Sequence, residues 1–132
     1  MTERKPLILL IEDNPDHAFY IQKGLSNRGF EIKWCAEGVE GLRAARTDAP
    51  EVILLDVMLP KVHGLDLLRE LKQDDETVGI PVIVVTAYAT LQLNREREMA
   101  MSYGAVDFLK KPFKVGDLAD KLHEILAGKD ND

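Results

Sequence analysis

Acidic and other polar residues stand directly behind the short apolar runs of this sequence. They are Glu12, Asp13, Asp56, Thr86 and Lys111. If the runs are strands of one parallel sheet, their carboxyl ends meet at a single edge, which is where open α/β sheets bind ligands. Three carboxylates, a hydroxyl and an ammonium group are then expected to converge.

The chemistry of such a set is restricted. Carboxylates held close together repel one another unless one is protonated or a cation lies between them. An oxygen-only cluster suits Mg²⁺, which keeps several of its waters. With a metal offsetting negative charge, a carboxylate can attack a phosphoryl group while a lysine and a hydroxyl hold the phosphoryl oxygens. The set contains every group that phosphoryl transfer to an aspartate requires.

The strands that must position these residues are indicated by the apolar pattern. Three runs rich in Ile and Val lack the alternation of a half-exposed strand, which indicates strands covered on both faces. These runs are Leu7–Ile11, Val52–Leu55 and Val82–Val85. Two mixed segments, Glu31–Cys35 and Ala105–Leu109, are typical of edge strands with a partly exposed face.

Helical periodicity fills the gaps between the strands. The apolar stripes are Ala18, Ile21 and Leu25; Val39, Leu42 and Ala45; Leu67, Leu68 and Leu71; and Leu118, Leu122 and Ile125. We expect Asn14 to cap the first helix with Pro15 at its first position, and Gly29 and Gly128 to end the first and last helices. Strand and helix alternate, five of each, which predicts an α/β fold: a doubly wound parallel sheet with helices on both faces.

Composition narrows the function classes. The chain has 132 residues, which suits one domain over residues 1–132 with a core of about residues 6–128 and frayed ends. A net charge of −6 argues against sequence-independent nucleic-acid binding. No apolar run approaches the roughly 20 residues of a spanning helix, and the charged start is unlike a signal peptide. The single cysteine, Cys35, is expected to be buried and agrees with a reducing compartment. We therefore predict a cytoplasmic protein without membrane insertion or direct nucleic-acid binding.

Four motifs give the chain a recognisable resemblance. They read I-L-L-I-E-D-N, L-L-D-V-M-L-P-K-V-H-G, V-V-T-A-Y and G-A-V-D-F-L-K-K-P-F. Over about residues 6–126 the chain resembles the receiver domain of bacterial response regulators, in a stand-alone, chemotaxis-regulator-like form. The resemblance implies a flavodoxin-like sheet with strand order 2-1-3-4-5. It also implies a phosphoacceptor switch of a two-component or phosphorelay system, which catalyses only its own phosphorylation and dephosphorylation.

The resemblance implies roles for the site residues. Asp56 is the expected phosphoacceptor, and the catalytic set is Asp56, Thr86 and Lys111. Asp13 is expected to contact Mg²⁺ directly, Glu12 through water, and Met58 through its main-chain carbonyl, so that Asp56 and these residues form the metal site. Thr86 and Phe108 are the expected switch pair, with Phe where Tyr is common. The positions flanking the site are Met58, Tyr88, Ala87 and Pro112, and the Lys111–Pro112 bond is expected to be cis.

Partners follow from the same resemblance only in class. The phosphodonor is expected to be a sensor histidine kinase or a phosphotransfer protein, and the fourth helix, fifth strand and fifth helix are expected to meet a downstream protein. From Thr86 to Gly104 the chain is longer than the usual family spacing by about three residues, nearly one helical turn. This difference alters the fourth helix or its leading loop, so the identity of the downstream partner does not follow.

Two other functions use a similar set of residues. Haloacid-dehalogenase-like phosphatases also combine a strand-end Asp with Thr or Ser, Lys and Mg²⁺, but they place a second Asp where this chain has Met58. A pseudo-receiver that works without phosphorylation usually lacks one of Asp13, Asp56 and Lys111, and all are present here. The histidines His17, His63 and His123 share no ligand spacing and are predicted to lie on the surface, with His63 in the loop after Asp56.

Overall fold

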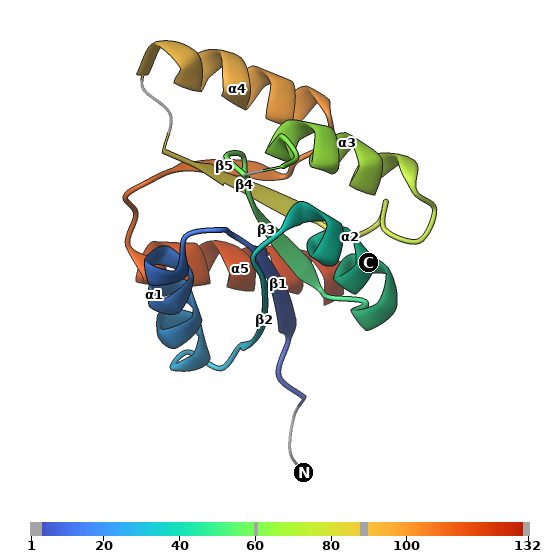
Figure 1. Ribbon diagram of the computed structural model, residues 1–132. Coiled ribbons are helices and arrows are strands. Elements are labelled where there is room, and N and C mark those ends of the chain that lie inside the picture. Colours follow the sequence, from blue (N-terminus) through green and yellow to red (C-terminus); the bar gives the residue numbers. More distant parts are fainter. Residues whose placement is uncertain (1–3, 60, 88–89, 131–132) are drawn as a thin grey trace.

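A five-stranded parallel sheet forms the centre of the protein, shown as a computed structural model in Figure 1. The structure describes residues 4–59, 61–87 and 90–130. The strands are β1 (Leu7–Ile11), β2 (Glu31–Cys35), β3 (Val52–Asp56), β4 (Val82–Thr86) and β5 (Asp107–Lys110). The helices are α1 (Pro15–Ser26), α2 (Gly38–Asp48), α3 (Gly64–Gln73), α4 (Thr90–Ser102) and α5 (Val115–Asp130). The strand order is β2-β1-β3-β4-β5. The predicted α/β fold and its strand order are confirmed.

The helices cover both faces of the sheet and bury a separate apolar cluster on each. Helices α1 and α5 lie on one face, and α2, α3 and α4 on the other (Figure 1). Successive strand residues point to opposite faces. In β1, Ile8 and Leu10 therefore pack beneath α1 and α5, whereas Leu9 and Ile11 pack beneath the other three helices. This two-sided burial is why the central strands read as continuous apolar runs.

The edge strands β2 and β5 are partly exposed, as their composition predicts. The fifth strand begins at Asp107 and not at Ala105, because Ala105 N–H donates back to the Ala100 carbonyl in the turn that follows α4. Strands β3 and β4 each extend one residue beyond the predicted run. Asp56 and Thr86 are therefore the last residues of their strands rather than the first residues of loops.

The predicted start of α1 is confirmed in detail. Asn14 is the N-cap, and its side chain accepts hydrogen bonds from the main-chain N–H groups of Asp16 and His17, at 2.9 and 3.1 Å. Pro15 occupies the first helical position. The helix therefore begins directly behind Asp13, and the chain can turn sharply after β1.

Two sequence predictions about helices are wrong. Helix α5 continues through Gly128 to Asp130, because Gly128 does not adopt the left-handed conformation that ends α1 near Gly29, where φ is 91°. Val39 is 63% exposed and lies outside the core. The buried face of α2 instead includes its two glycines, Gly38 and Gly41.

The predicted burial of Cys35 is confirmed. Among the described helices, none has the length and apolarity to span a membrane.

Candidate functional site

The sequence-predicted site residues gather at the carboxyl edge of the sheet. Glu12 follows β1, Asp56 ends β3, Thr86 ends β4 and Lys111 follows β5. One carboxylate oxygen from each of Glu12, Asp13 and Asp56 lies within 4.8 Å of the other two. Glu12 and Asp56 are buried, whereas Asp13 is exposed to solvent. Three acidic groups could therefore hold a cation that arrives from the solvent side.

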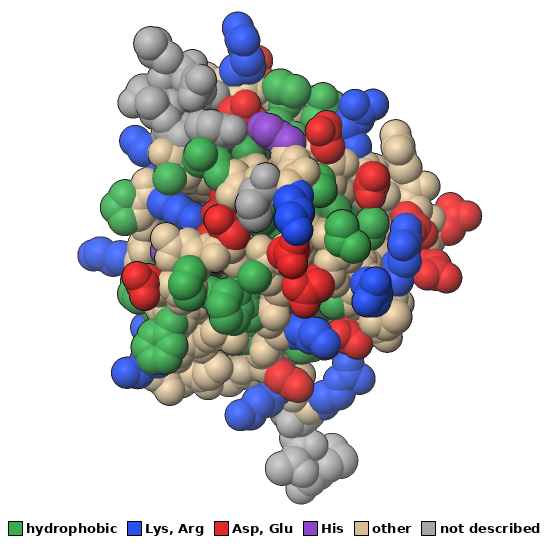
Figure 2. Space-filling model, viewed as in Figure 1, with side chains coloured by type: hydrophobic (Ala, Val, Ile, Leu, Met, Phe, Trp, Pro, Cys, Tyr) green, Lys and Arg blue, Asp and Glu red, His purple; other side chains and the backbone are tan. Residues whose placement is uncertain are grey.

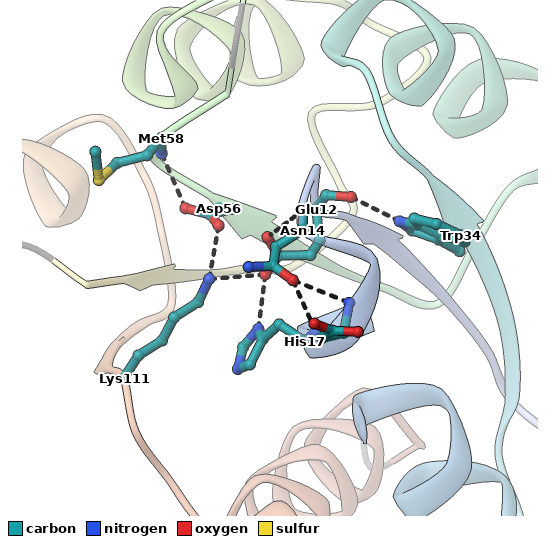
Figure 3. A network of polar contacts seen from close by, with 8 residues as sticks. Glu12, Asn14, His17, Trp34, Asp56, Met58 and Lys111 are labelled. Carbon is teal, nitrogen blue, oxygen red and sulfur yellow. Dashed lines mark hydrogen bonds and ion pairs between the residues drawn. The ribbon is translucent and has the colours of Figure 1, made fainter. Parts of the chain in front are cut away.

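Lys111 joins the two buried acids (Figure 3). Its Nζ donates to Glu12 Oε1 at 2.8 Å and to Asp56 Oδ2 at 2.7 Å. The Lys111 side chain is only 16% exposed, so solvent screens this ion-paired triad weakly. Burial by itself lowers the pKa of Lys111, but hydrogen bonds with Asp56 and Glu12 outweigh it and raise the pKa above its ordinary value.

The two buried carboxyls have pKa values shifted in opposite directions. Burial raises the pKa of Asp56 to about 6, helped by the nearby Glu12 carboxyl and opposed by Lys111. Burial also acts to raise the pKa of Glu12, but hydrogen bonds with His17, Asp56 and Lys111 outweigh it and lower the pKa to about 2. The arrangement thus places an ionised Glu12 beside an Asp56 that is less readily ionised without a cation.

The segment that follows β3 holds the Asp56 carboxylate in position. The main-chain N–H of Met58 donates to Asp56 Oδ1 at 2.9 Å, and Met58 pairs with His63 in an isolated antiparallel bridge. The Gly64 N–H donates to the Val57 carbonyl at 2.8 Å, which returns the chain to the strand end before α3 begins. Met58 as a whole is 50% exposed, so it lies at the protein surface two residues after Asp56.

The other predicted site residues are of two kinds, buried residues within the sheet and exposed residues beside its carboxyl edge. Thr86 is fully buried, and its carbonyl accepts from Lys111 N–H at 2.7 Å, so both residues stand at the same place on the edge. Phe108 is 6% exposed and pairs in register with Val84, deeper in the sheet. Ala87 and Pro112 are exposed, and the predicted cis bond before Pro112 is confirmed. Tyr88 lies outside the described residues.

Sequence reasoning missed two contacts of Glu12. His17 was expected on the surface, yet its side chain is only 20% exposed and its Nδ1 lies 2.7 Å from Glu12 Oε1. The Trp34 indole N–H donates to the Glu12 carbonyl at 2.6 Å (Figure 3). The predicted elements contained information on both contacts. His17 is the third residue of a helix that starts shortly after Glu12. Strand β2 runs parallel to β1 with Trp34 opposite Leu10, two residues before Glu12. The other histidines lie elsewhere: His63 caps α3, and His123 packs on Phe30.

Charges of both signs are interspersed over the face drawn in Figure 2. Lysine and arginine side chains alternate there with aspartate and glutamate, and they form no continuous basic surface on that face. Backbone-directed nucleic-acid binding depends on such a surface. The absence of direct nucleic-acid binding, expected from the net charge of −6, stays a prediction.

Comparisons with known proteins place the whole described core in one family. The model of the response regulator receiver domain matches residues 8–123. Protein PilH of Pseudomonas aeruginosa is 31% identical over 121 residues, which cover 92% of this chain and 98% of PilH. The transcriptional regulatory protein CusR of Escherichia coli is 33% identical over 119 residues, 90% of this chain but 50% of CusR. The chain thus spans about half the length of CusR and of the regulator RpaA of Synechocystis, of which it covers 51%.

Solved structures give the same result. The receiver domain of the sensor histidine kinase PA1611 from Pseudomonas aeruginosa, with a magnesium ion coordinated in its active-site cleft, is 31% identical with a TM-score of 0.84. The match covers 94% of this chain and 99% of that one. A CheY-like receiver domain from Methanospirillum hungatei is 26% identical with a TM-score of 0.87, and the match covers 97% and 98% of the two chains. Neither alternative function, the phosphatase or the pseudo-receiver, is favoured by these relatives. The chain belongs to the response regulator receiver domains, the phosphoacceptor signalling switches of two-component systems.

Proposed function

We propose that Asp56 of this chain accepts a phosphoryl group from a histidine kinase or phosphotransfer protein in a Mg²⁺-dependent reaction. The observation that carries the proposal is the buried ion-paired triad in which Lys111 joins Asp56 to Glu12, with Asp13 beside it. The donor set fits the metal, because clustered carboxylate oxygens are the ligands that Mg²⁺ takes in proteins. A bound Mg²⁺ supplies positive charge that offsets the carboxylates and the incoming phosphoryl oxygens.

The transfer itself is a displacement at phosphorus. A carboxylate oxygen of Asp56 forms the new O–P bond while the P–N bond to the donor imidazole breaks, and the imidazole keeps the electron pair and takes up a proton. Lys111 already donates to Asp56 and is in reach of a phosphoryl oxygen bound there. Thr86, at the end of the neighbouring strand, offers a hydroxyl on the same edge. The same residues hold the acyl phosphate when water removes it.

The ligand roles of the acids follow from their contacts. Glu12 Oε1 already accepts from Lys111 and His17, and Oε2 accepts from the Asn14 main-chain N–H at 3.1 Å. Three of the roughly four acceptor positions of this carboxylate are thus occupied, and one on Oε2 remains for a water. We therefore assign Glu12 to a water of the metal, whereas the similarity to receiver domains assigns Asp13, Asp56 and the main-chain carbonyl of Met58 to the metal itself.

The signal then passes through Thr86 and Phe108. Thr86 is drawn toward the phosphoryl oxygens, and Phe108 moves into the space behind it, which biases a pre-existing equilibrium between two states. The affected elements are α4, β5 and α5, and we propose that a downstream protein binds there.

The test is a phosphorylation assay read by intact mass. Incubation with acetyl phosphate and Mg²⁺ is expected to add one phosphoryl mass to the wild-type protein. Asp56→Asn is expected to add none, whereas Asp66→Asn, which changes an exposed acid in the first turn of α3, is expected to behave as wild type. A mass gain that persists in Asp56→Asn, or in excess chelator, overturns the proposal.

A further inference from the structure

Glu12 is held by two side-chain donors on the same oxygen. Its Oε1 lies 2.8 Å from Lys111 Nζ and 2.7 Å from His17 Nδ1. The Glu12 side chain has no exposed surface, so solvent does not supply a substitute for either donor. An ionised carboxylate only accepts hydrogen bonds, so His17 must carry a proton on Nδ1. The tautomer of the imidazole is thereby set by Glu12.

The ring of His17 is fixed by aromatic contacts on two segments of the chain. It stacks on Tyr20 of α1 at a centroid distance of 6.3 Å and meets the edge of Phe113 at 5.6 Å. Phe113 lies two residues beyond Lys111, and the Tyr20 hydroxyl donates to the Phe113 carbonyl at 3.4 Å. His17 therefore touches one acid of the site directly and the segment carrying the site lysine through its ring.

We propose that His17 is a positioning residue for the phosphoacceptor site, which orients the Glu12 carboxylate by donating a hydrogen bond from Nδ1. The inference rests on the proposed function and deepens it, because it adds a residue of α1 to the groups that determine metal binding. Without this donor, the Glu12 carboxylate retains Lys111 and the Asn14 N–H, and it can rotate toward Lys111 and away from the water it is assigned to hold.

The expected size of the effect follows from known metal sites. Groups that hydrogen-bond to metal-site ligands typically change metal affinity by about 10–100-fold when removed. Glu12 is assigned to a water of the metal and not to the metal itself, and Lys111 and Asn14 still hold it. We therefore expect the lower end of that range, about a 10-fold loss of Mg²⁺ affinity. We expect the lower affinity to result from removal of the His17–Glu12 hydrogen bond and not from loss of the packing of the His17 ring.

Two variants separate the hydrogen bond from the packing. His17→Phe keeps an aromatic ring against Tyr20 and Phe113 but removes the donor. His17→Asn places an amide N–H near the position of Nδ1 but removes the ring. His123→Phe is the matched control, because His123 packs on Phe30, which precedes β2 at the opposite edge of the sheet.

The readout is a Mg²⁺ titration followed by NMR of the Trp34 indole N–H, which donates to the Glu12 carbonyl and belongs to the only tryptophan of the chain. We expect a dissociation constant about 10-fold higher for His17→Phe, and values within about threefold of wild type for His17→Asn and His123→Phe. Acetyl phosphate labelling at limiting Mg²⁺ is expected to rank the variants in the same order and to converge at saturating Mg²⁺.

Wild-type affinity in His17→Phe, or a loss in His17→Asn that matches the loss in His17→Phe, overturns the role of the hydrogen bond. If His17→Phe does not fold, His17→Leu serves as the second donor-free variant under the same criteria. Failure of wild-type labelling overturns the proposed function, whereas the Mg²⁺ titration still decides the role of His17. The two failures are thus distinguishable.

Discussion

At the scale of single residues, the site holds more buried negative charge than Lys111 alone neutralises, and a bound cation or a proton offsets the excess. Asp56 and Glu12 are buried side by side, and one ammonium group, that of Lys111, serves both. Burial and the neighbouring Glu12 carboxyl disfavour the ionised form of Asp56 although Lys111 pairs with it, so without a cation the pKa of Asp56 is raised to about 6. Under the proposed function, the Asp56 carboxylate is therefore most available as an acceptor when a cation is bound.

This imbalance predicts the effect of Asp56→Asn on stability. The pKa of Asp56 rises from an ordinary 3.8 to about 6 on folding, so its stabilising contribution is present below about pH 4 and lost as the pH rises through 6. The neutral amide avoids that loss. In excess chelator at about pH 8, Asp56→Asn is expected to be more stable than wild type by on the order of 1 kcal/mol, since the lost pairing with Lys111 offsets part of the gain.

Thermal unfolding measured between about pH 5 and 8 checks the sign. The advantage of Asp56→Asn should shrink as the pH falls, because wild-type Asp56 becomes protonated. Asp120→Asn, an exposed acid on α5, is the matched control and should show no such trend. A variant less stable than wild type throughout this range contradicts the argument.

At the scale of elements, the connection from β3 to α3 holds the carboxyl end of β3 in place. A Cβ added to Gly64 would lie 2.5 Å from the Asp56 carbonyl oxygen and 2.5 Å from the Val57 Cα. Both neighbours are backbone atoms, which cannot move without displacing the strand end. The first residue of α3 therefore has to be glycine if the helix is to start this close to Asp56.

Gly64→Ala is expected to destabilise the fold by about 1–3 kcal/mol, the usual cost of forcing extra atoms into a packed site. Because the strain falls on the Asp56 backbone, acetyl phosphate labelling should also slow. Gly128→Ala is the matched control, since a Cβ there meets nothing within 4 Å, and it should be neutral or stabilising by about 0.5–1 kcal/mol. Urea unfolding of both variants measures the difference, and equal stabilities would refute the steric argument.

Thr86 ends β4, which lies between β3, the strand that carries Asp56, and the outer strand β5. Thr86→Ala is expected to leave labelling of Asp56 largely intact but to abolish most of the NMR shift changes in α4 and α5 that beryllofluoride, a phosphoryl mimic, induces. The reason is that the hydroxyl at the end of β4 is the group proposed to follow the phosphoryl oxygens. Thr86→Ser keeps the hydroxyl and should retain the shifts; their full retention in Thr86→Ala contradicts the proposed switch.

The elements were largely predictable because burial on both faces of a parallel sheet leaves a continuous apolar signature. Two helix predictions were wrong because neither the glycine at a helix end nor the apolar periodicity determines where a helix stops or which side chains it buries. Gly128 adopts ordinary helical geometry, and Val39 faces solvent although it continues an apolar stripe. The acid cluster was also predictable, since strand ends converge by topology. His17 and Trp34 were missed because their contacts with Glu12 depend on side-chain reach around a turn and across a strand pair.

At the scale of the whole molecule, the site is coupled to global stability through the sheet. Strands β1 and β3 carry residues of both apolar clusters and end at the acidic site. Unfolding therefore separates Asp56 from Glu12 and Asp13, and a cation that needs all of them binds only the folded state. Any specific Mg²⁺ binding must then raise the free energy of unfolding by mass action.

We expect Mg²⁺ at about ten times its dissociation constant to stabilise the fold by about 1.4 kcal/mol relative to excess chelator. For a chain of this size that corresponds to a rise in Tm of about 5 °C. A net charge of −6 means that any salt also relieves self-repulsion, so the reference must contain NaCl at matched ionic strength. Asp13→Asn removes an exposed ligand without leaving a buried charge, and it should lose most of the Mg²⁺ increment while responding normally to NaCl. If NaCl reproduces the full increment, or Asp13→Asn keeps it, the stabilisation comes from screening and not from occupation of the acidic site.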